Sequence, residues 1–182
     1  MNCETMFGAS QLRIGLLVLV LGGFFASCNS SDDSTTQWHE KNNAIYEEIK
    51  ANTDWLPLID KNDTNGWPQG VYYQDLSEPC VEKGSEHPLQ TAKVRVNYRG
   101  YYLNDPDNVF DNGGEKEFLV NGGGVIVRGF SVALQQMVTG DKWKICIPYY
   151  LGNGVTSTYS IQAYSTLFFE VELIKIIEQH PK

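Results

Sequence analysis

Two stretches in which apolar and polar residues strictly alternate constrain the fold of this chain more than any other feature. The first begins at Thr91, and its apolar side consists of Val94, Val96 and Tyr98. The second lies near the C-terminal end, and its apolar side consists of Leu167, Phe169, Val171 and Leu173. A period of two is that of a strand with one face on a core, and antiparallel sheets tolerate water on the other face. We therefore predict two long antiparallel strands, the first with its polar face in water.

Shorter segments complete a mixed fold. Residues 71–76, "VYYQDL", read as a first strand, and "WKICIP" at residues 143–148 reads as another because Trp143, Ile145 and Ile147 alternate with polar neighbours. Between the strands only "FSVALQQM", residues 130–137, has helical spacing, and Gly140 ends that helix. One short helix against several antiparallel strands indicates the α+β class.

The residues upstream of these strands form an extension. Residues 38–52 place Trp38, Ile45 and Ile49 on one side with Glu and Lys elsewhere. This pattern predicts a short amphipathic helix that docks on the domain or on a neighbour. The chain from there to Gly66 is rich in Asn, Asp and Pro, which is typical of a loop. We assign residues 38–69 to a helical extension and loop.

The N-terminal residues are typical of an export signal. Arg13 precedes the apolar run "IGLLVLVLGGFFAS", which is too short to span a membrane as a stable helix but fits the core of a signal peptide. The run ends in "FASC", which resembles a bacterial lipobox, the motif in which the cysteine, here Cys28, is lipidated. We expect residues 1–27 to be a signal peptide and residues 28–37 to be a solvated, lipidated tether. The alternative is an ordinary secretory signal with an incidental cysteine.

Composition limits the partners and the location. The chain of 182 residues, 42% hydrophobic, is long enough for one good core, so we expect one globular domain. A net charge of -8 with only 14 scattered basic residues argues against a nucleic-acid partner. The acidic patch after Cys28 resembles the surface-export signal of Bacteroidetes lipoproteins. We expect an exported protein that is anchored by a lipid to the outer membrane. It would lie either on the periplasmic face of that membrane or at the cell surface.

The cysteines and histidines allow fewer conclusions. Beyond Cys28, the exported chain contains Cys80 and Cys146, and spacing alone leaves open whether they form a disulfide or remain two thiols. The three histidines stand far apart without Cys or acidic companions at ligand spacing; they are His39, His87 and His180. The sequence therefore predicts no metal site.

The order of motifs resembles the FKBP-type peptidyl-prolyl cis-trans isomerases. The motifs are a "V.V.Y.G" strand, an "FD" pair, "V.RGF" opening a helix, "WK..IP", and a closing "STLFFEVEL" strand. The resemblance implies an FKBP-like isomerase domain at residues 70–178, in which a strongly bent antiparallel sheet, a half-barrel, wraps around the short helix. It also implies a proline-binding pocket between helix and sheet.

The resemblance also implies which residues form that pocket. By position, the residues expected to line it are Tyr98, Phe110, Asp111, Ile126, Val127, Phe130, Ile161 and Phe169. Phe130 stands where the family usually has tryptophan, and Asn153 stands at the position of a substrate-contacting tyrosine. The backbone N–H of Val127 is expected to hold a substrate carbonyl. For Asp111 the residues leave two interpretations, a carboxylate at the pocket rim or a cap of the following "NGG" turn.

The loop after Asp111, residues 112–117, is expected to be short, with Lys116 a partial substitute for the family's arginine. The implied reaction is rotation about X-Pro bonds of exported polypeptides, which needs no cofactor, and FKBP-type macrolides are implied ligands. Two alternatives remain at this stage: a non-catalytic peptide-binding or chaperone module on the same scaffold, and an accessory subunit of a surface complex that docks through residues 38–52.

Overall fold

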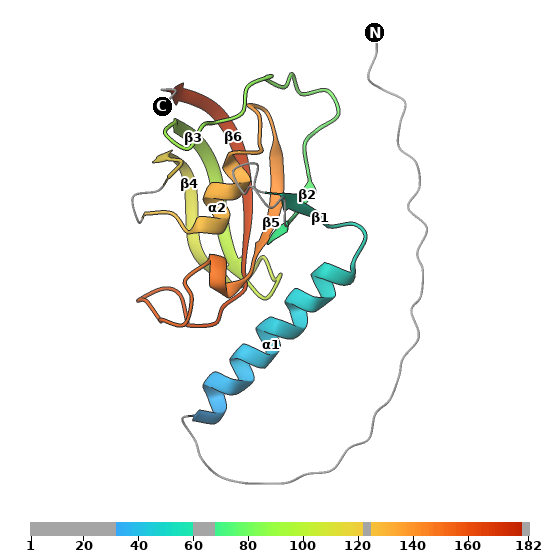
Figure 1. The fold of residues 1–182 in the computed structure, drawn as a ribbon, viewed down its shortest axis with the longest axis vertical. Helices are drawn as coiled ribbons and strands as arrows, with labels where there is room; N and C mark the ends of the chain where they lie inside the picture. The colour runs from blue at the N-terminus through green and yellow to red at the C-terminus, as the bar shows by residue number, and fades with distance from the viewer. Residues whose placement is uncertain (1–31, 60–67, 122–124, 180–182) are drawn as a thin grey trace.

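The computed structural model describes residues 32–59, 68–121 and 125–179, which form one sheet and its covering helices (Figure 1). In chain order the elements are α1 (Asp32–Ala51), β1 (Leu56–Ile59), β2 (Pro68–Asp75), β3 (Lys93–Tyr102), β4 (Val109–Leu119), α2 (Arg128–Leu134), β5 (Lys142–Ile147), the 3₁₀ turn η1 (Tyr149–Leu151) and β6 (Leu167–Glu178). The strand order is β1-β2-β5-β6-β3-β4, and every neighbouring pair is antiparallel. The predicted α+β class is confirmed.

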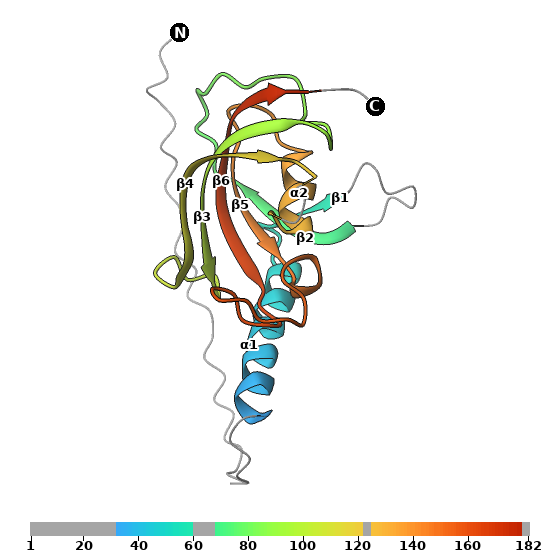
Figure 2. The same ribbon diagram turned by 90° about the vertical axis from the view of Figure 1, so that its left-hand side faces the viewer.

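The sheet bends around α2, which lies against its concave face (Figure 2). The apolar sides of the predicted strands all point to this helix, as the alternation requires. Their buried residues form the main core with the inward face of α2; from the helix they are Phe130, Val132, Ala133 and Leu134. The two long strands of the sequence analysis, β3 and β6, pair with each other at the centre. The core therefore places α2 opposite the middle of the sheet.

The opposite face of the sheet carries a second, smaller core. Tyr101, Phe168 and Cys146 lie side by side on this face, because Phe168 pairs with Tyr101 of β3 and with Cys146 of β5. All three are fully buried, and Tyr46 and Ile49 of α1 pack on them. The expected contact with water holds for the polar side chains of β3, such as Asn97, but α1 covers this face around Tyr101. The predicted docking of the helix on the domain is confirmed.

The second core also shows that Cys146 does not form the disulfide considered in the sequence analysis. Cys146 is a free thiol, fully buried between the sheet and α1, so the Cys80–Cys146 disulfide is not formed. Lys142 and Lys144 share this face of β5, and yet the thiol is buried because α1 packs over it. Sequence alternation shows which residues share a face, but only packing shows which face is covered.

The boundaries of three segments differ from the sequence predictions. The first helix begins at Asp32 rather than Trp38, so the expected tether is helical there, although residues 33–37 are exposed. Residues 56–59 form a strand, β1, where a loop was expected, because Leu58 is buried in the main core. Residues 112–117 belong to the long strand β4. The expected signal peptide and the lipidation position Cys28 lie outside the described residues.

None of the helices in the described ranges is both long enough and apolar enough to cross a membrane.

Candidate functional site

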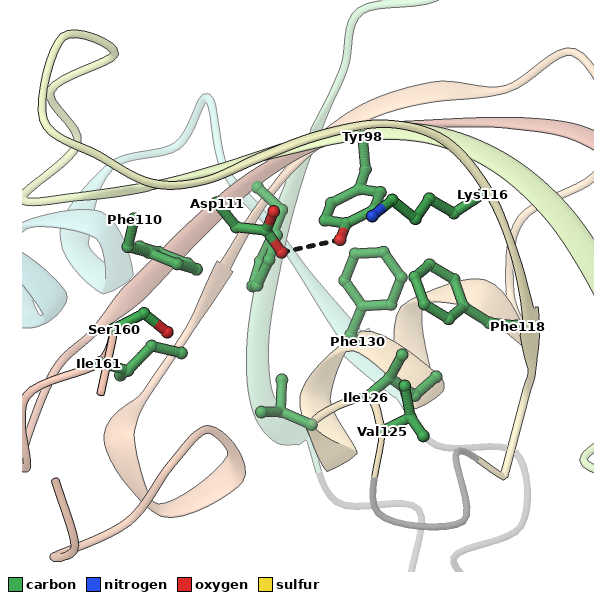
Figure 3. A pocket seen from close by; sticks show the side chains of 12 residues that line it. Tyr98, Phe110, Asp111, Lys116, Phe118, Val125, Ile126, Phe130, Ser160 and Ile161 are labelled. Atoms are coloured by element: carbon green, nitrogen blue, oxygen red, sulfur yellow. Dashed lines mark hydrogen bonds between the residues drawn. The ribbon is translucent and has the colours of Figure 1, made fainter. Parts of the chain in front are cut away.

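A pocket of about 370 Å³ opens between α2 and the concave face of the sheet (Figure 3). Its lining residues are Tyr98, Phe110, Asp111, Lys116, Phe118, Val125, Ile126, Val127, Phe130, Ser160, Ile161 and Phe169. This volume is in the range of pockets that bind small ligands. All but one of the predicted site residues therefore lie together, although they come from five separate parts of the chain.

Aromatic rings form the floor and walls of the pocket. The Phe169 ring meets Phe130 edge to face, with centroids 5.0 Å apart, and meets Phe110 in the same way at 5.4 Å. Tyr98 lies 5.9 Å from Phe130 by the same measure. Edge-to-face contacts at these distances are favourable and hold the rings in one arrangement. The result is a rigid apolar cavity with Phe130 at its base.

Gly100 of β3 makes room for two of these rings. A Cβ atom at this position would lie 2.6 Å from the Phe110 ring and 2.9 Å from the Phe169 ring. Both distances are below ordinary van der Waals contact. Glycine is therefore required where β3 passes behind the pocket wall.

The carboxylate of Asp111 is held at the pocket by two hydrogen bonds. The Tyr98 hydroxyl donates to Oδ2 at 2.7 Å, and the Gly113 backbone N–H donates to Oδ1 at 2.9 Å. Both interpretations of Asp111 are therefore correct, since one oxygen caps the turn and the other faces Tyr98 at the pocket. Burial, together with this carboxylate, raises the pKa of the Tyr98 hydroxyl, so Tyr98 stays a proton donor at neutral pH.

A bulge in β4 directs Asp111 to this position. The register between β3 and β4 shifts on either side of Gly100, which pairs with Asp111. Gly113 has a φ of +51°, and a Cβ there would collide with the Tyr98 carbonyl oxygen. Only glycine fits this turn, and β-bulges commonly redirect side chains near binding sites.

The backbone of Val127 supplies a polar group at the start of α2. Its carbonyl accepts the N–H groups of Phe130 and Ser131. Within the described ranges its own N–H donates to no backbone carbonyl, as is usual for the residue that begins a helix. Val127 itself lines the pocket.

Four residues line the pocket that the sequence analysis did not assign to it: Lys116, Phe118, Val125 and Ser160. Lys116 and Phe118 pair with Val96 and Val94, which face the core, so alternation along β4 puts them on the same side. The alternation is therefore a sequence signal for both residues, and the expectation of a loop over residues 112–117 obscured it for Lys116. Nothing in the local sequence around Val125 or Ser160 marks a site residue.

Lys116 differs from the other lining residues in its charge and exposure. Its side chain is exposed, and the acidic residues beside it pair elsewhere, Glu115 with Arg95 and Glu117 with Lys93. Figure 3 draws its side chain among those that line the pocket. The pocket thus has one cation and one carboxylate among its lining residues.

Asn153 is the predicted site residue that does not line the pocket. Its amide donates at 2.9 Å to the carbonyl of Thr156, within the same loop. The expectation that Asn153 takes the place of a substrate-contacting tyrosine is not met, because an amide this short is used by the local turn.

Comparisons with known proteins agree with this geometry. Residues 84–174 match the family model of the FKBP-type peptidyl-prolyl cis-trans isomerase, and this range contains the whole pocket. A crystal structure of a peptidyl-prolyl cis-trans isomerase from Pseudomonas syringae superimposes with a TM-score of 0.61 at 23% identity, over 84% of this chain and all of that one. That likeness shows a shared fold.

Two relatives are similar in sequence. The macrophage infectivity potentiator of Trypanosoma cruzi is 32% identical over 165 residues, which are 86% of this chain and 80% of the relative. The FKBP-type 22 kDa peptidyl-prolyl cis-trans isomerase of Escherichia coli is 40% identical over 95 residues, 50% of this chain and 44% of the relative. This chain therefore matches less than half the length of the second protein.

Proposed function

Because the chain belongs to the family of FKBP-type peptidyl-prolyl cis-trans isomerases, we propose that it accelerates cis-trans rotation of X-Pro bonds in polypeptides outside the cytoplasm. The observation that carries the proposal is the aromatic pocket with a hydrogen-bonded carboxylate, Asp111, among its lining residues. Family membership favours catalysis over a purely peptide-binding role.

The chemistry of prolyl rotation explains why such a pocket suffices. Rotation must break amide resonance, with a barrier of about 20 kcal/mol, and the twisted amide is less polar than the planar one. An apolar pocket disfavours the planar, polar amide more than the twisted one, which is catalysis by differential binding. The reaction forms and breaks no covalent bond. We assign proline binding to the walls formed by Phe110, Ile126, Phe130, Ile161 and Phe169.

The polar groups of the pocket have separate proposed roles. The Val127 N–H donates to a substrate carbonyl and fixes the peptide across the mouth of the pocket. The Asp111 carboxylate, held by Tyr98, lies beside the rotating amide and interacts with its carbonyl carbon as the resonance is lost. Tyr98 positions Asp111 and packs against Phe130.

The direct test is a prolyl isomerisation assay with the chain from residue 29 onward, over peptides that differ in the residue before proline. We expect the rate of X-Pro rotation to rise in proportion to protein concentration and to fall when an FK506-type macrolide, the ligand class of this family, is added. The Asp111→Ala variant, purified in the same way, controls for contaminating isomerases. Macrolide binding with no acceleration of any peptide would show a non-catalytic binding module instead.

We also propose that the protein is exported and anchored to a membrane through a lipid on Cys28. The support is the apolar run that ends in "FASC", which is followed by polar residues. Labelling with a fatty-acid probe should mark the wild type and not the Cys28→Ala variant. Equal labelling of the two would contradict the anchor without affecting the proposed enzymatic activity.

A further inference from the structure

One wall of the pocket belongs to a long segment without regular structure. Residues 152–166 connect η1 to β6, and Ser160 and Ile161 of this segment line the pocket. Residues 155–160 are exposed, and much of the segment's hydrogen bonding is internal, as between Thr158 and Ile161. Such bonds shape a turn but do not fix it relative to the sheet. The position of the wall must therefore be set by contacts from outside the segment.

Tyr102 of β3 provides the first of these contacts. Its hydroxyl donates to the Ser160 carbonyl at 2.6 Å and accepts the Gln162 N–H at 3.3 Å, so it binds the backbone on both sides of Ile161. Its ring lies 4.8 Å from that of Phe110, centroid to centroid. Tyr102 thereby joins the wall formed by this segment to an aromatic wall built on the sheet, although Tyr102 does not line the pocket.

The N-terminal half of α1 provides the other contacts. Trp38 donates from Nε1 to the Ser165 hydroxyl at 3.1 Å, and its ring meets Tyr102 edge to face at 5.5 Å. Asn42, fully buried, accepts the Thr166 N–H at 2.8 Å. Figures 1 and 2 both show α1 beside this segment. Apart from the segment's own flanking residues, the hydrogen bonds that fix it to the described chain come from α1 and Tyr102.

We propose that Trp38 and Tyr102 are positioning residues of the pocket, so that α1 is a functional part of the isomerase rather than only a spacer. The inference rests on the proposed function. Trp38 orients Tyr102, and Tyr102 holds Ile161 at the distance from Phe110 that a proline ring requires. Without Trp38 and Tyr102, residues 160–162 move away from Phe110 part of the time. A smaller fraction of the molecules can then bind the twisted amide.

Three variants of the whole chain test the proposal. Tyr102→Phe removes the hydroxyl and keeps the ring, and Trp38→Ala removes the support of that ring. Tyr46→Phe is the matched control: Tyr46 lies about two turns beyond Trp38 along α1. Its hydroxyl donates to the Gly70 carbonyl and lies 3.3 Å from the Tyr150 hydroxyl in η1, and neither of these contacts reaches residues 152–166. Trp38→Ala and Tyr46→Phe each remove a contact of α1, and Tyr102→Phe removes a contact of the segment. Only Trp38→Ala and Tyr102→Phe act on the pocket wall.

The first readout is kcat/KM measured well below the unfolding temperature of each variant. We expect Tyr102→Phe and Trp38→Ala each to lower it about two- to tenfold, the range for one lost hydrogen bond or ring contact. The double variant should lose less than the product of the two single losses, because both residues act through one segment. Tyr46→Phe should keep the wild-type value. Unchanged kcat/KM in folded Tyr102→Phe and Trp38→Ala, or fully multiplicative losses, would overturn the proposal.

The second readout does not depend on catalysis. Tyr159 is fully exposed in the segment, so chymotrypsin cleavage after it under native conditions reports how often the segment opens. We expect cleavage to be about two- to tenfold faster in Tyr102→Phe and Trp38→Ala and unchanged in Tyr46→Phe. If the wild type has no isomerase activity but the variants show the expected cleavage rates, the proposed function is refuted. The contacts of Trp38 and Tyr102 with the segment would still be supported. Equal cleavage rates in all proteins would refute the positioning role.

Discussion

At the scale of single residues, Asp111 shows how one side chain serves the local turn and the pocket together. Its two oxygens accept different donors, the Gly113 N–H and the Tyr98 hydroxyl. The turn bond fixes the carboxylate, and the fixed carboxylate then orients the tyrosine. From the sequence, the turn cap and the pocket carboxylate were alternative roles for Asp111, whereas in the structure the residue has both.

We predict that Asp111→Ala lowers kcat/KM by about tenfold, equivalent to about 1.4 kcal/mol, and lowers stability by only about 1 kcal/mol, the usual effect of losing a partly exposed hydrogen bond. Isomerase kinetics and denaturant unfolding of the same preparation measure the two quantities. Asp105→Ala is the matched control, because Asp105 also accepts a backbone N–H two residues later, that of Asp107, but lies outside the pocket. A loss of stability with unchanged kcat/KM would make Asp111 a turn cap alone.

At the scale of elements, α1 is attached through a buried polar contact as well as through apolar packing. Asn42 is fully buried and accepts two hydrogen bonds from Thr166, the residue that precedes β6: its Oδ1 accepts the Thr166 N–H, and its backbone carbonyl accepts the Thr166 hydroxyl. Its side chain also donates to the Trp38 carbonyl at 2.8 Å. Buried polar groups that satisfy each other fix the register of the packed elements, since any shift leaves them unpaired.

We expect Asn42→Ala to lower the free energy of unfolding by about 1 to 3 kcal/mol, because the Thr166 N–H is left buried without its acceptor. Asn43→Ala, one residue along on the exposed side of α1, should change it by less than about 0.5 kcal/mol. Denaturant titration of both variants gives the comparison. Equal effects would mean that the buried contact adds nothing to the attachment of α1.

The bulge in β4 gives a second prediction at this scale. Gly113→Ala should be clearly more destabilising than Gly114→Ala, although both glycines have positive φ angles, +51° and +79°. A left-handed conformation costs a non-glycine residue about 1 to 2 kcal/mol at either position. Only at Gly113 does the new Cβ also meet the Tyr98 carbonyl, whereas nothing lies within 4 Å at Gly114. Thermal unfolding tests the order, and a reversed order would show that the β4 turn is not packed against β3 in this way.

At the scale of the whole molecule, the centre of the sheet is covered on both faces, and the second core contains groups that resist ionisation. Burial raises the pKa of the Cys146 thiol well above its usual value of 9.0, an effect that nearby Lys144 only partly offsets. Burial likewise raises the pKa of Tyr101 and of Tyr46 in the same core. In the unfolded chain these groups titrate with their usual pKa values.

Stability should therefore fall at alkaline pH. Above about pH 9 the unfolded chain loses the Cys146 proton while the folded chain keeps it, so the free energy of unfolding drops by up to about 1.4 kcal/mol per pH unit for this group. The stabilisation is fully present below pH 9 and disappears as pH rises towards the folded-state pKa. Cys146→Ala should flatten the curve between about pH 9 and 10, below the ordinary pKa of tyrosine, which is about 10. Urea titrations at several pH values provide the test, and parallel curves for the two proteins would contradict it.

The sequence by itself determined the strands β2, β3, β5 and β6, the central helix and most of the pocket. The alternation along β3, β5 and β6 reflects a backbone geometry that any half-buried strand shares, so it could be read without coordinates. The motif order then placed residues such as Phe110, Phe130 and Phe169 at one site. These are local or family-wide properties.

Only the tertiary structure decided what covers the outer face, how Asp111 is held, and which side chain stabilises the loop wall. Cys146 is buried, Tyr102 joins two walls of the pocket, and Asn153 bonds within its own loop. The sequence around each residue does not indicate these roles, because a side chain's role depends on neighbours distant in sequence. The docking of α1 buries Cys146, brings Trp38 onto Tyr102, and thereby sets the position of Ile161. Such long-range contacts depend on the packing of whole elements, which no short stretch of sequence encodes.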